Sequence, residues 1–257
     1  MRKILLFATL CLVTLMSHAQ MVAVVNYMKV PPSGDDAYAA NEKEWKKIHQ
    51  TRVNEGKMIA WELFYIHNQG TGSPYNYATV DVYENLEAAL KGLTLDDIKK
   101  AWGEKYNDVL KKTNTVRNLV YSETLGWTMG LQSKEAEKYL MISSMKSRDQ
   151  GKYLDMEKKA YMPMHQAAMD QGKLNGWSIW TRWFNNDTNW DAVAVNSYTS
   201  AAQIGTMDYN AAFEKAKTGK NTNDLVEMIT LMNETNDLRT IVQTQLWELV
   251  DITTPKK

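Results

Sequence analysis

The sequence EWKKIHQTRVNEGKMIAW at residues 44–61 returns as AYMPMHQAAMDQGKLNGW at residues 160–177. Each copy places an aromatic residue four positions before a histidine, and a Gly-Lys pair and a tryptophan follow. The equivalent positions are Trp45/Tyr161, Ile48/Met164, His49/His165, Gly56/Gly172 and Trp61/Trp177. Matches in the same order over this length indicate an internal duplication, which must be recognised before a fold is assigned.

The duplication extends in both directions from these two stretches. Further equivalent pairs are Met28/Met145, Lys29/Lys146, Val80/Val195, Tyr83/Tyr198, Asn114/Asn236, Arg117/Arg239 and Val120/Val242. The chain of 257 residues is long enough for two domains of ordinary size. We therefore expect a first repeat at residues 20–130, a linker at residues 131–137 and a second repeat at residues 138–257.

Each repeat shows the same order of expected elements. Short runs rich in β-formers predict strands, and apolar residues at helical spacing predict helices. The expected strands are 21–30, 57–67, 75–83 and 115–129 in the first repeat, and 138–146, 173–183, 190–198 and 238–252 in the second. The expected helices are 39–55 and 153–171, each ended by a glycine, and 95–112, which follows a capping box of Thr94 and Asp97. At the equivalent place the second repeat is expected to have two helices, with extra residues around 218–223 between them. The order β-α-β-β-α-β, twice over, predicts the α+β class with tandem ferredoxin-like units.

The repeat and its element order resemble the dimeric α/β-barrel superfamily, in which two ferredoxin-like units pair sheet to sheet. The resemblance implies that this one chain supplies both units and forms an intramolecular barrel. It also implies ligand sites between the helices and the sheet of one unit. The superfamily includes cofactor-free monooxygenases, polyketide cyclases and haem-binding or haem-degrading proteins, so the fold alone does not assign an activity. We expect a closer match to an uncharacterised family of exported bacterial proteins.

The N-terminus has the features of a signal peptide. Arg2 and Lys3 precede an apolar run that ends at Met16, and Ala19 follows among small residues. The run is too short to span a membrane comfortably. We expect cleavage after residue 19, export to the periplasm or the cell exterior, and no membrane span in the mature chain. The one cysteine, Cys11, lies in this segment, so the mature chain has no thiol for catalysis or metal binding.

Charge and motifs exclude several classes of function. Lys and Arg number 30 and Asp and Glu number 30, which gives zero net charge, whereas a nucleic-acid-binding protein is expected to carry a basic surface. No H-E-x-x-H motif occurs, and we predict no metal site. Nine Trp and thirteen Tyr stand beside four Phe, and such rings combine a large apolar surface with one polar atom, which suits a pocket wall.

His49 and His165 are the candidate catalytic residues. They occupy the equivalent place on the apolar stripe of each first helix, and the expected pairing of the sheets puts these helices on opposite outer faces. The two histidines are then too far apart to share a metal ion. Each could act as a general base or as an axial haem ligand. Each could instead be a structural side chain, hydrogen-bonded to the backbone or to the neighbouring strand.

The candidate ligand-binding residues come from the same repeated stretches and from the start of each last strand. They are Trp45, Arg52, Trp61, Tyr161, Trp177, Arg117 and Arg239. Trp61 and Trp177 lie on one face of the second strand, and Glu62 and Ser178 lie on the other. The two tryptophans could be core residues or a pocket wall. The strand-end arginines could clamp a ligand carboxylate or pair within the protein.

These patterns leave three functions open. We expect an exported protein that binds a small, partly apolar or aromatic molecule between helix and sheet, with no cofactor predicted and haem not excluded. One alternative is a cofactor-independent enzyme, similar to a monooxygenase or a cyclase, that uses His49 or His165 as proton acceptor. The other is a structural or protein-interaction module. A small-molecule partner is expected and nucleic acid is not, and a homo-oligomer is not required.

Overall fold

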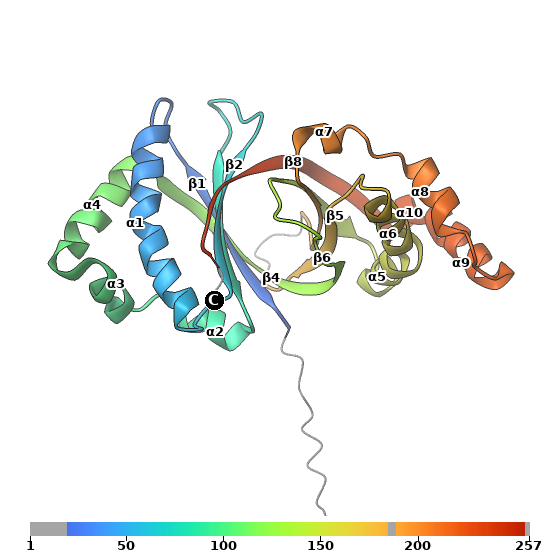
Figure 1. Ribbon diagram of the computed structural model, residues 1–257, viewed down its shortest axis with the longest axis horizontal. Helices are drawn as coiled ribbons and strands as arrows, with labels where there is room; N and C mark the ends of the chain where they lie inside the picture. Colours follow the sequence, from blue (N-terminus) through green and yellow to red (C-terminus); the bar gives the residue numbers. More distant parts are fainter. Residues whose placement is uncertain (1–19, 185–188, 255–257) are drawn as a thin grey trace, which may run out of the picture.

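Eight strands close into one barrel in the part of the chain that the computed structural model describes, residues 20–184 and 189–254 (Figure 1). The strands are β1 (Val22–Lys29), β2 (Ala60–Ile66), β3 (Tyr77–Tyr83), β4 (Asn118–Leu131), β5 (Tyr139–Ser147), β6 (Gly176–Arg182), β7 (Ala192–Tyr198) and β8 (Arg239–Ile252). Their order around the barrel is β1-β3-β2-β8-β5-β7-β6-β4, and neighbouring strands are antiparallel. The predicted signal peptide, residues 1–19, lies outside the described residues.

Helices cover the outside of the barrel in two groups. The first repeat contributes α1 (Asp35–Asn54), α2 (Leu86–Lys91), α3 (Leu95–Trp102), the 3₁₀ turn η1 (Gly103–Lys105) and α4 (Tyr106–Val116). The second contributes α5 (Gln150–Met156), the π-helical segment η2 (Glu157–Tyr161), α6 (Met162–Asp170), α7 (Ala201–Ile204), α8 (Tyr209–Ala216), α9 (Thr222–Asn233) and α10 (Thr235–Leu238). The two groups lie on opposite sides of the barrel, as predicted for the first helices (Figure 1). None of the helices in the described ranges is long and apolar enough to cross a membrane.

The two repeats join edge to edge. Within each repeat the strand order is β4-β1-β3-β2 or β8-β5-β7-β6, which is the ferredoxin-like order. The edge strand β2 pairs with β8 of the other repeat, and β6 pairs with β4. Strands β4 and β8, of 14 residues each, are long enough to pair with strands of both repeats. The predicted α+β fold with tandem ferredoxin-like units is confirmed, and the two sheets are continuous rather than separate layers.

Side chains alternate between the barrel interior and the surface under the helices, as the two-residue period of a strand requires. On β2, Trp61 and Leu63 pack under α1, whereas Phe64 belongs to the interior cluster. On β6, Trp177 and Ile179 pack under the helices of the second repeat. The prediction that the two tryptophans share one face of their strands is confirmed.

The helix α1 forms because its apolar residues recur at the spacing of one helix face. The buried residues of its second half are Ile48, His49, Arg52 and Val53. Gly56 follows the end of the helix with φ of 72°, a left-handed conformation that glycine adopts without strain. The predicted helix over residues 95–112 is divided into α3, η1 and α4, and the capping box at its start is present.

The first helix of the second repeat departs from the prediction of one regular helix over residues 153–171. It consists of α5, η2 and α6 in succession. Tyr153 and Glu157 are equivalent to Tyr38 and Glu42, but from Tyr161 onward the equivalence has shifted by one residue. A π-helical turn absorbs a single inserted residue, so the buried face continues on both sides of it.

Candidate functional site

A cavity of about 510 Å³ lies inside the barrel, with residues from all eight strands in its wall. The aromatic residues of the wall are Tyr27, Trp127, Trp177, Trp180 and Trp247. The aliphatic ones include Ala23, Val25, Val80, Val82, Leu125, Leu140, Ile142, Val193 and Val195. A predominantly apolar hollow of this size, with a few polar groups in it, is the usual form of a small-molecule site in proteins.

Glu62 lies in this wall because its strand neighbours Trp61 and Leu63 point to the helices. Its carboxyl group is almost completely surrounded by protein. The residue is nevertheless partly exposed, because it faces the cavity. Burial, and second the negative charge of Glu137, raise the pKa of Glu62 to about 8. No described residue forms a hydrogen bond or an ion pair with this carboxyl group.

Glu137 belongs to the segment that joins the repeats, and this segment forms one rim of the cavity. Burial raises the pKa of Glu137, and the hydroxyl groups of Ser133 and Ser197 partly offset that effect. The two serine oxygens lie 3.0 Å apart. Gly176 lies against them, and a Cβ atom at this position would collide with Ser133 and Ser197. The absence of a side chain at Gly176 therefore leaves room for the hydroxyl groups beside Glu137.

The far end of the cavity is closed by aromatic rings around Tyr27. Its ring lies 4.7 Å from that of Tyr75, 4.4 Å from that of Tyr121 and 5.9 Å from that of Trp247. Its hydroxyl group donates to Glu123 Oε2 over 3.4 Å. Tyr75 and Tyr121 in turn line a second hollow, of about 530 Å³, so these rings lie between the cavity and that hollow.

Glu123, which lies beside the ring of Tyr27, forms an ion pair within the protein. Arg182 Nη2 lies 2.9 Å from Glu123 Oε1, and both side chains are buried. The guanidinium group of Arg182 also lies 4.3 Å from the centre of the Trp190 ring. A buried acid at this end thus has its cation, in contrast to Glu62 and Glu137 at the other end.

His49 and His165 stack on the paired tryptophans outside the barrel. The His49 ring is parallel to that of Trp61, with centroids 5.4 Å apart and planes inclined by 4°. His165 lies over Trp177 at 4.9 Å and 21°. The same contact in both repeats shows that it came with the duplicated scaffold.

Both histidines are buried and uncharged at neutral pH. His49 is 7% exposed and His165 is 5% exposed, and neither Nδ1 atom forms a hydrogen bond. Burial lowers the pKa of each to about 3, with Arg52 and Arg117 adding to the effect at His49 and Arg239 at His165. The hydrogen bond predicted for a structural histidine is thus not made by Nδ1, and stacking fixes the rings instead.

Arg117 pairs with a glutamate of the first helix, which sequence reasoning did not single out. Its Nε atom lies 3.0 Å from Glu42 Oε1, and Glu42 is buried whereas the Arg117 side chain is 13% exposed. Its guanidinium carbon lies 5.8 Å from the Trp45 ring centre. The equivalent group in the second repeat consists of Arg239, Glu157 and Tyr161. Of the two roles predicted for these arginines, the structure shows the internal pair.

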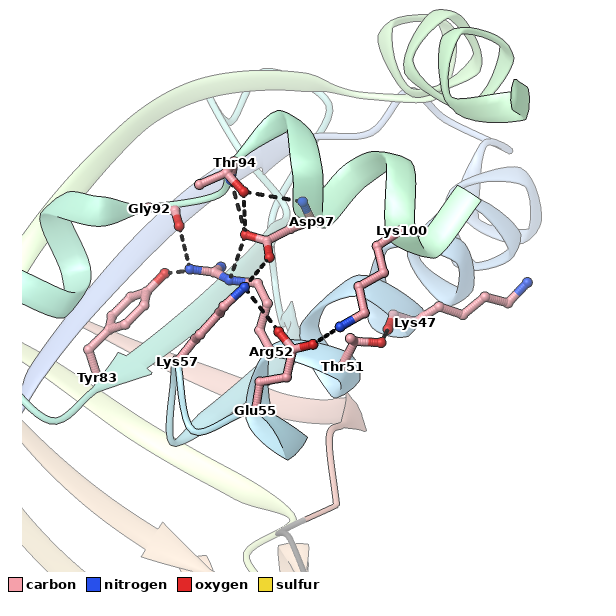
Figure 2. A network of polar contacts seen from close by, with 10 residues as sticks. All are labelled: Lys47, Thr51, Arg52, Glu55, Lys57, Tyr83, Gly92, Thr94, Asp97 and Lys100. Atoms are coloured by element: carbon pink, nitrogen blue, oxygen red, sulfur yellow. Dashed lines mark hydrogen bonds and ion pairs between the residues drawn. The ribbon is translucent and has the colours of Figure 1, made fainter. Parts of the chain in front are cut away.

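Arg52 is held in a separate polar network at the end of α1 (Figure 2). It donates to the carbonyl oxygen of Gly92 over 2.6 Å and lies 3.9 Å from the carboxylate of Asp97. Lys57 reaches the same carboxylate over 2.6 Å. The network ties α1 to the start of α3, so Arg52 fastens helices together and lies outside both histidine groups.

Apart from Arg52, the predicted site residues fall into two equivalent groups, one in each repeat. The groups are His49 with Trp45, Trp61 and Arg117, and His165 with Tyr161, Trp177 and Arg239. Among these residues, Trp177 alone also borders the barrel cavity.

Comparison with known proteins identifies the fold. No protein-family model matches the chain, and no curated protein does. A proposed monooxygenase from Fusobacterium nucleatum subsp. nucleatum superposes with a TM-score of 0.54 at 9% identity, over 94% of this chain and 100% of that chain. An anthrone oxidase-like protein gives 0.53 at 10% identity, over 94% and 95%. A mutant chlorite dismutase from Candidatus Nitrospira defluvii gives 0.50 at 7% identity, over 90% and 91%.

The chain has the dimeric α/β-barrel fold. At these identities the likeness establishes the architecture and leaves the function to the site. The fold expected from the repeat and the element order is confirmed over about nine-tenths of the chain.

Some dimeric α/β-barrel proteins bind haem, but the residues that line this cavity do not fit it. Neither histidine lines the barrel cavity. The described wall contains no histidine or cysteine. Within the described ranges, no group of three or more His, Cys, Asp or Glu side chains is placed to hold a metal ion. We assign no haem to this cavity.

Glu62 and Glu137 are the functional candidates that sequence reasoning missed. The alternation of β2 does put Glu62 on the face opposite Trp61, but nothing in the sequence marks that face as the wall of a cavity. Glu137 lies in the segment expected to be a linker, where a glutamate is ordinarily solvated.

Proposed function

We propose that the mature chain is an exported protein that binds a small, partly apolar or aromatic molecule inside its barrel. The observation that carries the proposal is the 510 Å³ cavity, whose wall is apolar and aromatic except for Glu62, Glu137 and a few neutral polar groups. We therefore propose a ligand position between the two repeats, in place of the predicted position between helix and sheet, where the packed histidine groups lie.

The wall is suited to a flat or branched organic molecule. Burial of apolar ligand surface is worth about 25 cal/mol per Å², and the rings of Trp180 and Trp247 offer faces for stacking. Their indole N–H groups are already bound, to Ser178 Oγ over 2.9 Å and to Gln245 Oε1 over 3.2 Å. The rings are therefore fixed in place and present mainly their carbon surfaces.

A thermal-shift screen of small aromatic molecules tests the proposal. A ligand that binds the native state raises the melting temperature, by an amount that grows with the logarithm of its concentration divided by its dissociation constant. In the variant Val195→Phe the added ring occupies the cavity, so the shift should disappear. The matched control is Val226→Phe on α9, which is 57% exposed and should keep the shift. An equal shift in the Val195→Phe variant would contradict binding in the barrel.

The second candidate is an enzyme that uses the same cavity without a cofactor. The observation in its favour is the raised pKa of Glu62, about 8, since a carboxyl group with a pKa near the working pH can both give and take a proton. His49 and His165, with pKa values of about 3, are poor proton acceptors at neutral pH. We therefore move the catalytic role predicted for them to Glu62.

Turnover separates the two candidates. A ligand found in the screen is incubated with the protein in air and followed by mass spectrometry. An enzyme converts it, and Glu62→Gln stops conversion while leaving the binding of an uncharged ligand intact. A ligand recovered unchanged supports a binding protein.

A further inference from the structure

The charges around the cavity are unbalanced. The titratable groups in its described wall are Tyr27, Glu62 and Glu137, and no lysine, arginine or histidine is among them. Tyr27 lies at the far end, and burial raises its pKa well above its ordinary value. The cavity therefore offers two carboxyl groups at one end and no cation to either.

Four other enclosed carboxylates of the described chain form an ion pair, and a fifth, Asp81, has none but is near enough to Arg52 for that positive charge to favour its ionised form. Ion pairs join Glu42 to Arg117 at 3.0 Å, Glu123 to Arg182 at 2.9 Å, Glu157 to Arg239 at 3.5 Å and Asp97 to Lys57 at 2.6 Å. An unpaired buried charge is expensive, so enclosed acids are normally paired. Glu62 and Glu137 break the pattern of their own protein, and they do so in the wall of an open cavity.

We infer that the cavity takes a molecule with an apolar or aromatic body and a positively charged nitrogen, held between Glu62 and Glu137. The inference rests on the proposed function, because it names the class of ligand for the same cavity. The cation supplies the partner that the protein itself supplies to its other enclosed acids. The aromatic wall adds to this selectivity, since Trp127, Trp180 and Trp247 can contact a cation through their ring faces.

The ligand charge is coupled to a proton. Near neutral pH Glu62 holds a proton, because burial and Glu137 raise its pKa to about 8. When a cation enters, Glu62 ionises, the proton leaves to solvent, and the carboxylate pairs with the ligand. Binding of the cation should therefore strengthen as the pH rises toward 8, whereas binding of a neutral molecule should not.

Three matched probes test the inference by isothermal titration calorimetry at pH 6.5 and pH 8.5. They are benzyltrimethylammonium, its uncharged isostere neopentylbenzene, and benzylsulfonate. The quaternary nitrogen does not titrate, so a pH effect belongs to the protein. We expect the cation to bind about tenfold more tightly than the isostere at pH 8.5, the preference to shrink at pH 6.5, and the anion to bind most weakly.

In the variants Glu62→Gln and Glu137→Gln the affinities for the cation and for neopentylbenzene should become about equal. The binding of neopentylbenzene itself should be kept. Glu135→Gln is the control, because Glu135 is exposed and lies in the same connecting segment, and it should leave the preference unchanged. Circular dichroism checks that each variant is folded. Proton release is read from the dependence of the binding heat on buffer ionisation enthalpy.

The outcomes distinguish this inference from the proposed function. Equal affinities for the cation and the isostere would overturn the inference and leave the proposed function standing. Loss of the preference in Glu135→Gln as well would also overturn it. If none of the three probes binds, the proposed ligand cavity fails together with the inference.

Discussion

The imidazole ring of His49 lies parallel to the indole ring of Trp61, 5.4 Å away, and His165 and Trp177 repeat the contact in the other half of the chain. The duplicated contact therefore belongs to the packing between helix and barrel. It explains why the most conspicuous repeated residues of the sequence are not the ones that face the cavity.

The buried histidines should make the protein sensitive to acid. Their pKa values are about 3 in the folded chain and about 6.5 in an unfolded one, so the unfolded state binds more protons between these values. Stability should fall as the pH drops from about 6.5 to 3, by up to about 1.4 kcal/mol per pH unit for each histidine. Urea unfolding across this range measures the free energy of unfolding at each pH. That free energy should change less steeply with pH in His49→Phe and in His165→Phe than in the wild type. An unchanged pH dependence in both variants would mean that the rings are protonated in the folded state.

Glu62, in contrast, should make the folded protein less stable as the pH rises. Its folded pKa of about 8 lies above that of an unfolded chain, so its contribution to stability is complete below about pH 4.5 and is lost as the pH rises through 8. Glu62→Gln should match the wild type at pH 4 and exceed it by on the order of 2 kcal/mol at pH 9, after allowance for water in the cavity. Denaturant titrations at the two pH values measure this difference. A variant that is less stable than the wild type at pH 9 would contradict the account.

Removing only one member of the ion pair between Arg117 and Glu42 should lower the stability of the protein. Arg117→Met leaves the Glu42 carboxyl group without its cation and should destabilise the protein by about 3 kcal/mol at pH 8. Adding Glu42→Gln should recover a large part of the loss. Lys91→Met is the control, because Lys91 and Glu87 are paired at the surface, 73% and 79% exposed, and breaking that pair should have no measurable effect. Equal losses in the Arg117 and Lys91 variants would contradict the role assigned to burial.

The architecture could be predicted from the sequence because the same unit occurs twice in the chain. The pairs Trp45/Tyr161 and Gly56/Gly172 fixed the helix and its end in both halves, and the alternation around Trp61 fixed which face of β2 meets the helix. These features depend on neighbours within a few positions of the chain. The inserted residue between Glu157 and Tyr161 was missed because a helical pattern with one extra residue still has an apolar face, and the π-helical turn appears only in three dimensions.

The cavity could not be predicted because it depends on contacts between distant parts of the chain. Glu62 faces the interior only because β2 pairs with β8 and β4 with β6, which closes the barrel. Glu137 reaches the rim because the connecting segment crosses the barrel end beside Ser133 and Ser197. A pattern on one strand or in one linker contains no information about such closure.

The most direct test of the central claim is native mass spectrometry of the mature chain from the exported fraction of its own host, with Val195→Phe expressed and purified in the same way. We predict an additional small mass on the wild-type protein that is lost on denaturation and is missing from Val195→Phe. The same bound mass on both proteins would place the ligand outside the barrel, and a bare wild-type polypeptide would contradict a stably held ligand.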